Sequence, residues 1–174
     1  MAYVTPGSVH MKGFEQVMSN LNTQIKLIKG RTVQGMIVGS IIVRNDMEKT
    51  APLTPVDLGN LRASWFAVTA TKRAEDPMGG KFRNPPKAKG KEAQRASIMK
   101  AQHSATIGEY KGKAAMTKEP VLFMGFSAFY AAPVHEMLGA NFKRPGAGPK
   151  WFEAAVKRNT PKIVAAIAEN AKIQ

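Results

Sequence analysis

One long helical pattern, ending at a proline, constrains the fold more than any other feature. Apolar and small residues recur every three or four positions, a spacing that places them on one face of a helix. They are Phe14, Met18, Leu21, Ile25, Ile28, Gly35, Gly39 and Ile42. Because the residue before a proline is pushed out of helical geometry, the helix must end by Ala51.

The length of this helix raises two alternatives. From about residue 12 to residue 50 it would extend about 58 Å at 1.5 Å per residue, more than a small sheet can cover. Part of its apolar face is therefore expected in the core or against another copy of the chain. Gly30, Gly35 and Gly39 each cost about 1 kcal/mol relative to alanine. They allow either a kink near Gly30 or the close packing of a second helix.

The stretch "APLTPVDLGNLRASW" after the helix predicts a turn that leads into a strand. Thr54-Pro55 favours extended backbone, Asp57 a local cap or Asx-turn, and Gly59-Asn60 a tight reversal. Residues 65–70 then read as a strand whose side chains alternate between its two faces.

The second half of the chain predicts three more elements. They are a strand over 121–126, a short helix over 129–138, and an amphipathic helix from Trp151 in which Pro161 threatens a kink. We expect a single α+β domain spanning residues 1–174. Its small, mostly antiparallel sheet would pack against the long N-terminal helix and the C-terminal helix, and residues 1–12 would form an arm.

Residues 72–118 stand apart by their charge. The whole chain carries 26 Lys and Arg against 12 Asp and Glu, for a net charge of +14. Twelve of those bases and four of the acids fall within 72–118. The segment is also rich in Pro and Gly, so we expect a basic loop or arm with a short helix around 91–103.

This insertion is the candidate contact for a polyanion or a protein partner. Its basic residues are Lys81, Arg83, Lys87, Lys89, Lys91 and Arg95. Phe82 is a candidate stacking residue, and phosphate binding by such an arm would be independent of base sequence and sensitive to salt. Two alternatives stay open: a solvated loop, and an arm that becomes ordered on docking to a neighbouring subunit.

The sequence predicts no catalytic, cofactor-binding or metal site. The chain has no cysteine, and His10, His103 and His135 share no metal-ligand spacing. No phosphate-binding loop and no "GxSxG" pattern is present. The apolar run over 36–43 is far shorter than the roughly 20 residues of a membrane span. The N-terminus lacks the pattern of a signal peptide.

Three short motifs, taken in order, resemble the head–tail joining or tail-completion family of tailed bacteriophages. The first includes Pro55, Gly59, Leu61 and Arg62. The second is "YAAPVHE", with Tyr130, Ala131, Val134 and Glu136, and the third is the Trp151-Phe152 start of the last helix. Leu58 departs from the family pattern, which usually has Thr or Ser there, and "VHEML" lacks the Gly-Thr that commonly follows the Glu.

The resemblance implies a structural virion protein without enzymatic activity. It would act at the neck or upper tail, as a head–tail connector, tail-completion or tail-terminator subunit, after assembly in the host cytoplasm. It implies a homo-oligomeric ring, hexameric or dodecameric, that contacts neighbouring neck and tail proteins and packaged DNA, with no membrane. Ring contacts of this kind are heterologous, and arms such as 1–12 and 72–118 are natural clasps.

The resemblance also bears on the turn after the long helix. Leu61 is expected to be buried, and Arg62 to hold a carboxylate such as Glu136 or a carbonyl of the turn, with an exposed Arg62 as the alternative. The competing function is sequence-independent nucleic-acid binding through the basic 81–100 segment.

Overall fold

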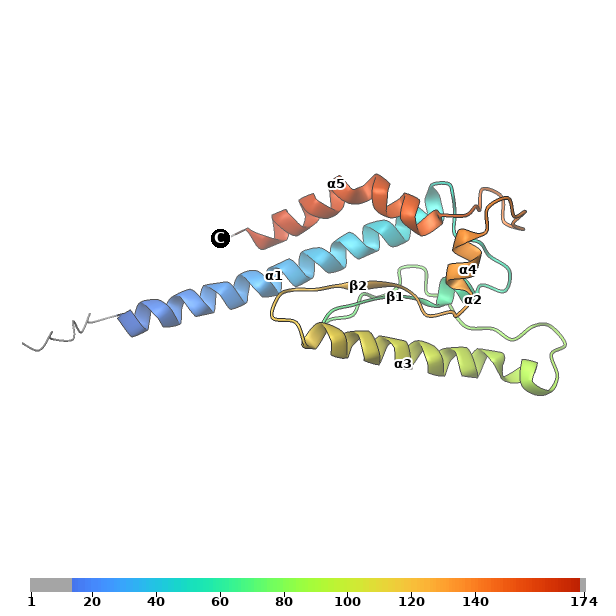
Figure 1. Ribbon diagram of the computed structural model, residues 1–174, viewed down its shortest axis with the longest axis horizontal. Coiled ribbons are helices and arrows are strands. Elements are labelled where there is room, and N and C mark those ends of the chain that lie inside the picture. Colours follow the sequence, from blue (N-terminus) through green and yellow to red (C-terminus); the bar gives the residue numbers. More distant parts are fainter. Residues whose placement is uncertain (1–13, 173–174) are drawn as a thin grey trace, which may run out of the picture.

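Two long helices and a third helix enclose a two-stranded sheet in the computed structural model, which describes residues 14–172 (Figure 1). Helices α1 and α5 lie on one side of the sheet and α3 on the other (Figure 1). The α+β class expected from the sequence is confirmed. The elements are α1 (Phe14–Lys49), α2 (Asn60–Ala63), β1 (Trp65–Val68), a 3-10 helix (Gly90–Gln94), α3 (Arg95–Ala115), β2 (Phe123–Phe126), α4 (Ala131–Glu136) and α5 (Trp151–Ala171).

Helix α1 is a single 36-residue helix without a break at Gly30. Two of its other glycines face α5 instead: a Cβ added at Gly35 would lie 2.6 Å from the Cα of Ile167, and one added at Gly39 would lie 3.0 Å from the Ile163 side chain. Of the two alternatives that the sequence left open, close helix packing is therefore the correct one for these glycines.

The end of α1 is fixed from both sides. Thr54 closes it by donating its backbone N–H (2.9 Å) and its hydroxyl (3.3 Å) to the Met47 carbonyl. Arg158 of α5 donates to Asp46 and, at 3.0 Å, to the Ala51 carbonyl. Burial alone would raise the pKa of Asp46, but the hydrogen bonds from Arg158 and neighbouring side chains outweigh it and lower that pKa. The charged pair therefore holds α5 onto the last turn of α1.

The sheet is covered on both faces. Strands β1 and β2 pair antiparallel, with Trp65 opposite Phe126, and all four β1 residues are buried. Neighbouring residues of a strand face opposite sides. The guanidinium of Arg44 from α1 accordingly lies over the Trp65 ring, while the Phe66 ring lies 5.4 Å from Tyr110 of α3.

Helix α3 corrects the expectation that residues 72–118 form a loop or arm with a short helix around 91–103. The helix runs to Ala115, and Tyr110 bridges Phe66 and Phe123 across the sheet. The small, basic composition hid the inner face of this helix, where Met99, His103 and Ala114 are buried and Tyr110 is half-buried. The insertion thus supplies one layer of the fold. The arm expected over 1–12 lies outside the described residues.

Helices α4 and α5 match the remaining expectations in type but not in extent. Helix α4 is shorter than the expected 129–138 because it begins only at Ala131 and ends at Glu136. Helix α5 continues through Pro161 to Ala171 and bends along its length (Figure 1).

Candidate functional site

The three motif segments, far apart in sequence, meet at one end of the molecule. The first follows α1 and is tied to the loop before α5, because Leu53 N–H donates to the Gly146 carbonyl at 2.9 Å. Gly59 has a φ of 86°, a left-handed conformation that glycine adopts without strain, and it starts the short helix α2. Leu61 is buried, as expected.

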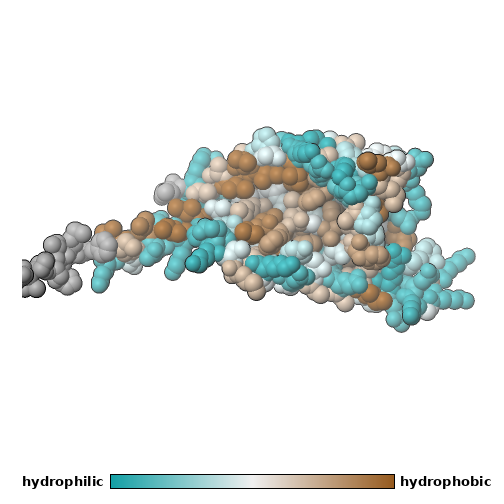
Figure 2. All heavy atoms as spheres, in the orientation of Figure 1, coloured by the Kyte–Doolittle hydropathy of each residue, from teal (hydrophilic) through white to brown (hydrophobic). Residues whose placement is uncertain are grey.

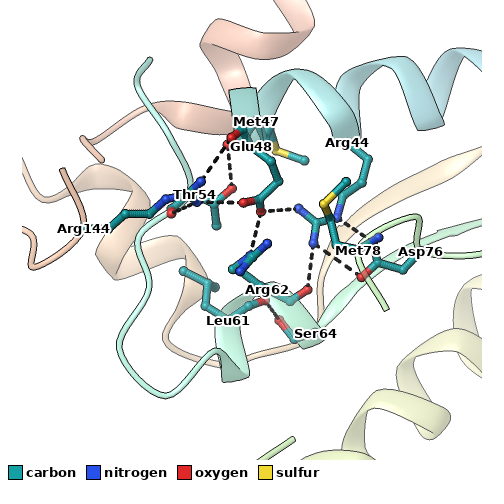
Figure 3. A network of polar contacts seen from close by, with 10 residues as sticks. All are labelled: Arg44, Met47, Glu48, Thr54, Leu61, Arg62, Ser64, Asp76, Met78 and Arg144. Carbon is teal, nitrogen blue, oxygen red and sulfur yellow. Dashed lines mark hydrogen bonds and ion pairs between the residues drawn. The ribbon is translucent and has the colours of Figure 1, made fainter. Parts of the chain in front are cut away.

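A network of buried charges lies behind this turn (Figure 3). The side chain of Glu48 is only 5% exposed. Its carboxylate forms ion pairs with three arginines: Arg44 at 2.6 Å, Arg62 at 3.0 Å and Arg144 at 2.7 Å. Arg44 is fully buried and also contacts Asp76 at 2.9 Å. Three guanidinium groups thus surround two carboxylates.

The network joins four segments of the chain. Arg44 and Glu48 come from α1, Arg62 from α2, and Asp76 from the segment after β1 (Figure 3). Arg144, in the loop before α5, also donates to the Thr54 carbonyl at 3.0 Å and the Glu48 carbonyl at 3.1 Å. We call this network the clasp, because it holds the four segments together and hydrogen bonds satisfy each of its buried charges.

Arg62 holds a carboxylate, as expected, but that carboxylate is Glu48 and not Glu136. Arg62 reaches Glu48 because α2 lies against the last turns of α1, whereas Glu136 lies at the end of α4 beside Lys150. Hydrogen bonds from Lys150 and then from His135 lower the pKa of Glu136. His135 also contacts Trp151, with ring centroids 4.8 Å apart, so the second motif meets the third.

The other motif residues build the core of this end of the molecule. Trp151 is fully buried and packs edge-on against Phe126, and Phe152 packs against the same ring. Tyr130 is half-buried, and burial raises its pKa. The guanidinium of Arg95 lies 6.0 Å from the centre of the Tyr130 ring.

A pocket of about 320 Å³ opens between the first two motifs. Its lining includes Pro55, Gly59, Leu61, Tyr130 and Val134. Charged groups also line it, since Arg95, Lys143 and Asp57 belong to the same pocket and Lys143 pairs with Asp57 at 2.6 Å. The pocket therefore combines an apolar wall with a few charged groups at its rim.

All six predicted basic residues are exposed: Lys81, Arg83, Lys87, Lys89, Lys91 and Arg95. Asn60 holds their loop near the pocket by accepting from the Arg83 N–H at 2.7 Å and donating to the Arg83 carbonyl at 2.9 Å. Phe82 is not an exposed stacking residue. It packs on the core and meets His103 edge-on at 5.6 Å.

His103 forms a polar chain that the sequence did not predict. Its Nδ1 lies 2.8 Å from the Ser127 hydroxyl, and its Nε2 lies 3.4 Å from Arg73. Because Arg73 can only donate, Nε2 accepts, Nδ1–H donates to Ser127, and Ser127 donates to the Ser64 carbonyl at 3.3 Å. In this tautomer Nδ1 cannot accept a proton from the serine. The chain fastens α3 to the sheet.

Sequence reasoning missed Glu48, Arg44, Asp76 and Arg144. The only signal was the spacing of Arg44 and Glu48, four residues apart on one helix face, which is typical of an ion pair. Nothing in the sequence connected Asp76 or Arg144 to them. Within residues 14–172, no cluster of three His, Asp or Glu side chains is suited to a metal ion, and no helix is long and apolar enough to cross a membrane.

Comparison of the chain with models of protein families, with curated proteins and with solved structures finds no match.

Proposed function

We propose that this chain is a structural subunit of a tailed-phage neck. It assembles as a homo-oligomeric ring, acts as a head–tail connector or tail-completion (tail-terminator-like) protein, and binds neighbouring neck and tail proteins. The copy number of the ring and the identity of its neighbours belong to the same proposal. The proposal rests on the motif residues that resemble the head–tail joining family.

The supporting observation is the convergence of those three motifs. The first two line one pocket, and the second and third are joined through His135 and Trp151. The first two motifs thus face a common surface pocket formed by loops and short helices, the kind of place where binding residues concentrate. The Glu48 network holds that surface rigid, as a subunit that must match its neighbours requires.

The exposed basic residues fit the same role. Lys89 and Lys91, at the start of the 3-10 helix, are exposed and form no ion pair with an acidic side chain among the described residues. On a ring they would face either acidic surfaces of the adjoining proteins or the packaged DNA. Contacts with DNA phosphates would weaken steeply as salt rises.

Mass and shape in solution test the proposal. We expect closed rings of discrete mass, seen by light scattering and electron microscopy, that persist at high salt without DNA. A protein that forms no ring, and whose mass changes only when duplex DNA is added and reverts in salt, would contradict it.

The second candidate function is sequence-independent nucleic-acid binding, which the exposed bases of 81–95 favour. The pair of substitutions Lys89→Glu and Lys91→Glu tests it. Under this alternative they abolish DNA binding, while the control pair Lys49→Glu and Lys162→Glu, on exposed helix surfaces elsewhere, changes it far less. Under the neck proposal, rings form in both variants.

A further inference from the structure

The first half of α1 projects beyond the rest of the described structure (Figure 1). Every residue from Glu15 to Leu27 is exposed, and we name this segment the overhang. The covered part of α1 begins at two contacts. Arg31 donates to the carbonyl of Lys172, just after α5, at 2.5 Å, and Lys29 pairs with Glu119, which precedes β2, at 3.1 Å.

The overhang carries an uncovered apolar face (Figure 2). Val17 is 63% exposed, Leu21 51%, Ile25 41% and Met18 40%. Steps of three or four residues lead from this face through Ile28 and Thr32 to Gly35 and Gly39, which pack against α5. The face therefore continues the α1–α5 interface beyond the end of α5 at Ala171. It lacks only a second helix.

We propose that this face binds the overhang of a second copy of the chain, with the two helices antiparallel. Pairing centred near Leu21 brings Val17 of one copy opposite Ile25 of the other. The only charged side chains of the overhang, Glu15 and Lys26, lie on the same flank of the apolar face. The midpoint between Glu15 and Lys26 along the helix falls within one residue of Leu21, the centre of the antiparallel pair. Each Glu15 therefore lies beside the Lys26 of the other copy.

Charge selects this arrangement over the parallel one. In a parallel pair, the two-fold axis along the helices places the flanks that carry Glu15 and Lys26 on opposite sides of the contact, so neither charge has a partner across it. The antiparallel pair instead forms two opposite-charge contacts, which complement the shared apolar face.

This contact is isologous and closes on two copies, unlike the heterologous contacts of a ring. It therefore stands whether or not the proposed neck function holds, and one substitution can test it alone. The overhang is about 20 Å long at 1.5 Å per residue, so we expect a reversible pair rather than an obligate one.

The first test measures mass by sedimentation over a wide range of concentration. We expect Leu21→Asp to weaken pairing by more than about tenfold, because it buries a charge at the centre of the contact. Thr23→Asp adds the same charge on the opposite side of the helix and should leave pairing intact. Equal effects of the two substitutions, or a wild-type chain that never pairs, would overturn the proposal.

The absence of cysteine from the chain allows a second test of direction without background reaction. We expect a mixture of Val17→Cys and Ile25→Cys proteins to form the mixed disulfide on mild oxidation, well above either self-linked product. A Val17→Cys protein that links mainly to itself would establish a parallel pair and overturn the proposal. Glu15→Lys should weaken pairing, and adding Lys26→Glu should restore it; failure of that rescue also counts against the antiparallel pair.

Discussion

At the scale of single residues, Glu48 is the side chain on which the most segments depend. Its two oxygens accept from Arg44 and Arg62 on one side and from Arg144 on the other. Removing its charge would leave the fully buried guanidinium of Arg44 with Asp76 as its remaining charged partner. An ion pair in such a place contributes little compared with an apolar substitute, but its loss is costly because it leaves a buried charge without compensation.

We expect Glu48→Gln to lower the free energy of unfolding by about 3–5 kcal/mol. Urea denaturation followed by tryptophan fluorescence measures this, since Trp65 and Trp151 are both buried. The control is Glu119→Gln, which breaks the exposed pair with Lys29 and should cost less than about 1 kcal/mol. A similar, small loss for both variants would show that the clasp does not stabilise the fold.

His103 makes stability depend on pH. Burial, and then the charge of Arg73, lowers its pKa, although Asp76 opposes this shift. The unfolded chain therefore takes up a proton on His103 at a higher pH than the folded chain does. The contribution of neutral His103 to the stability of the fold is complete above the unfolded pKa of about 6.5. It is lost as the pH falls toward the folded pKa.

We expect the melting temperature to decrease as the pH is lowered below about 6.5, and the substitution His103→Gln to make that decrease smaller. An unchanged slope in the variant would place the effect elsewhere.

At the scale of elements, the contact between α1 and α5 depends on the absence of side chains at two positions. Gly35 lies against the backbone of Ile167, which cannot move aside without shifting the whole helix. Gly30 lies only five residues earlier on the same helix, and a Cβ there would meet nothing within 4 Å. One helix thus provides both a critical glycine and its own control.

We expect Gly35→Ala to destabilise the protein by about 1–3 kcal/mol, because the added methyl group forces α5 away from α1. Gly30→Ala should stabilise it by up to about 1 kcal/mol, because alanine is the better helix former. Thermal unfolding of the two variants gives the comparison. Stabilisation by both would show that the helices can separate without loss.

At the scale of the whole molecule, periodicity predicted the elements and left their partners unknown. The stripe on α1, the strands near Trp65 and Phe123, and the helix from Trp151 follow from local pattern, and the α+β class follows from their order. Helix α3 was underestimated because only a few widely spaced residues, Met99, His103, Tyr110 and Ala114, form its inner face among many small and basic ones. The Arg62 partner was mistaken because a single arginine gives no sign of which carboxylate the fold will bring near it.

The packing of Gly35 against Ile167 also has a consequence for the order in which the protein is made. On the ribosome, α1 is synthesised long before α5. Strand β1 likewise cannot pair until α3 and then β2 have been synthesised. Contacts between such distant segments form late, because the intervening chain must first be closed into a loop. The nascent chain therefore displays the covered part of α1 as well as the overhang until α5 has emerged. During that interval, neighbouring nascent chains on one messenger can meet through their first helices before any of them has folded.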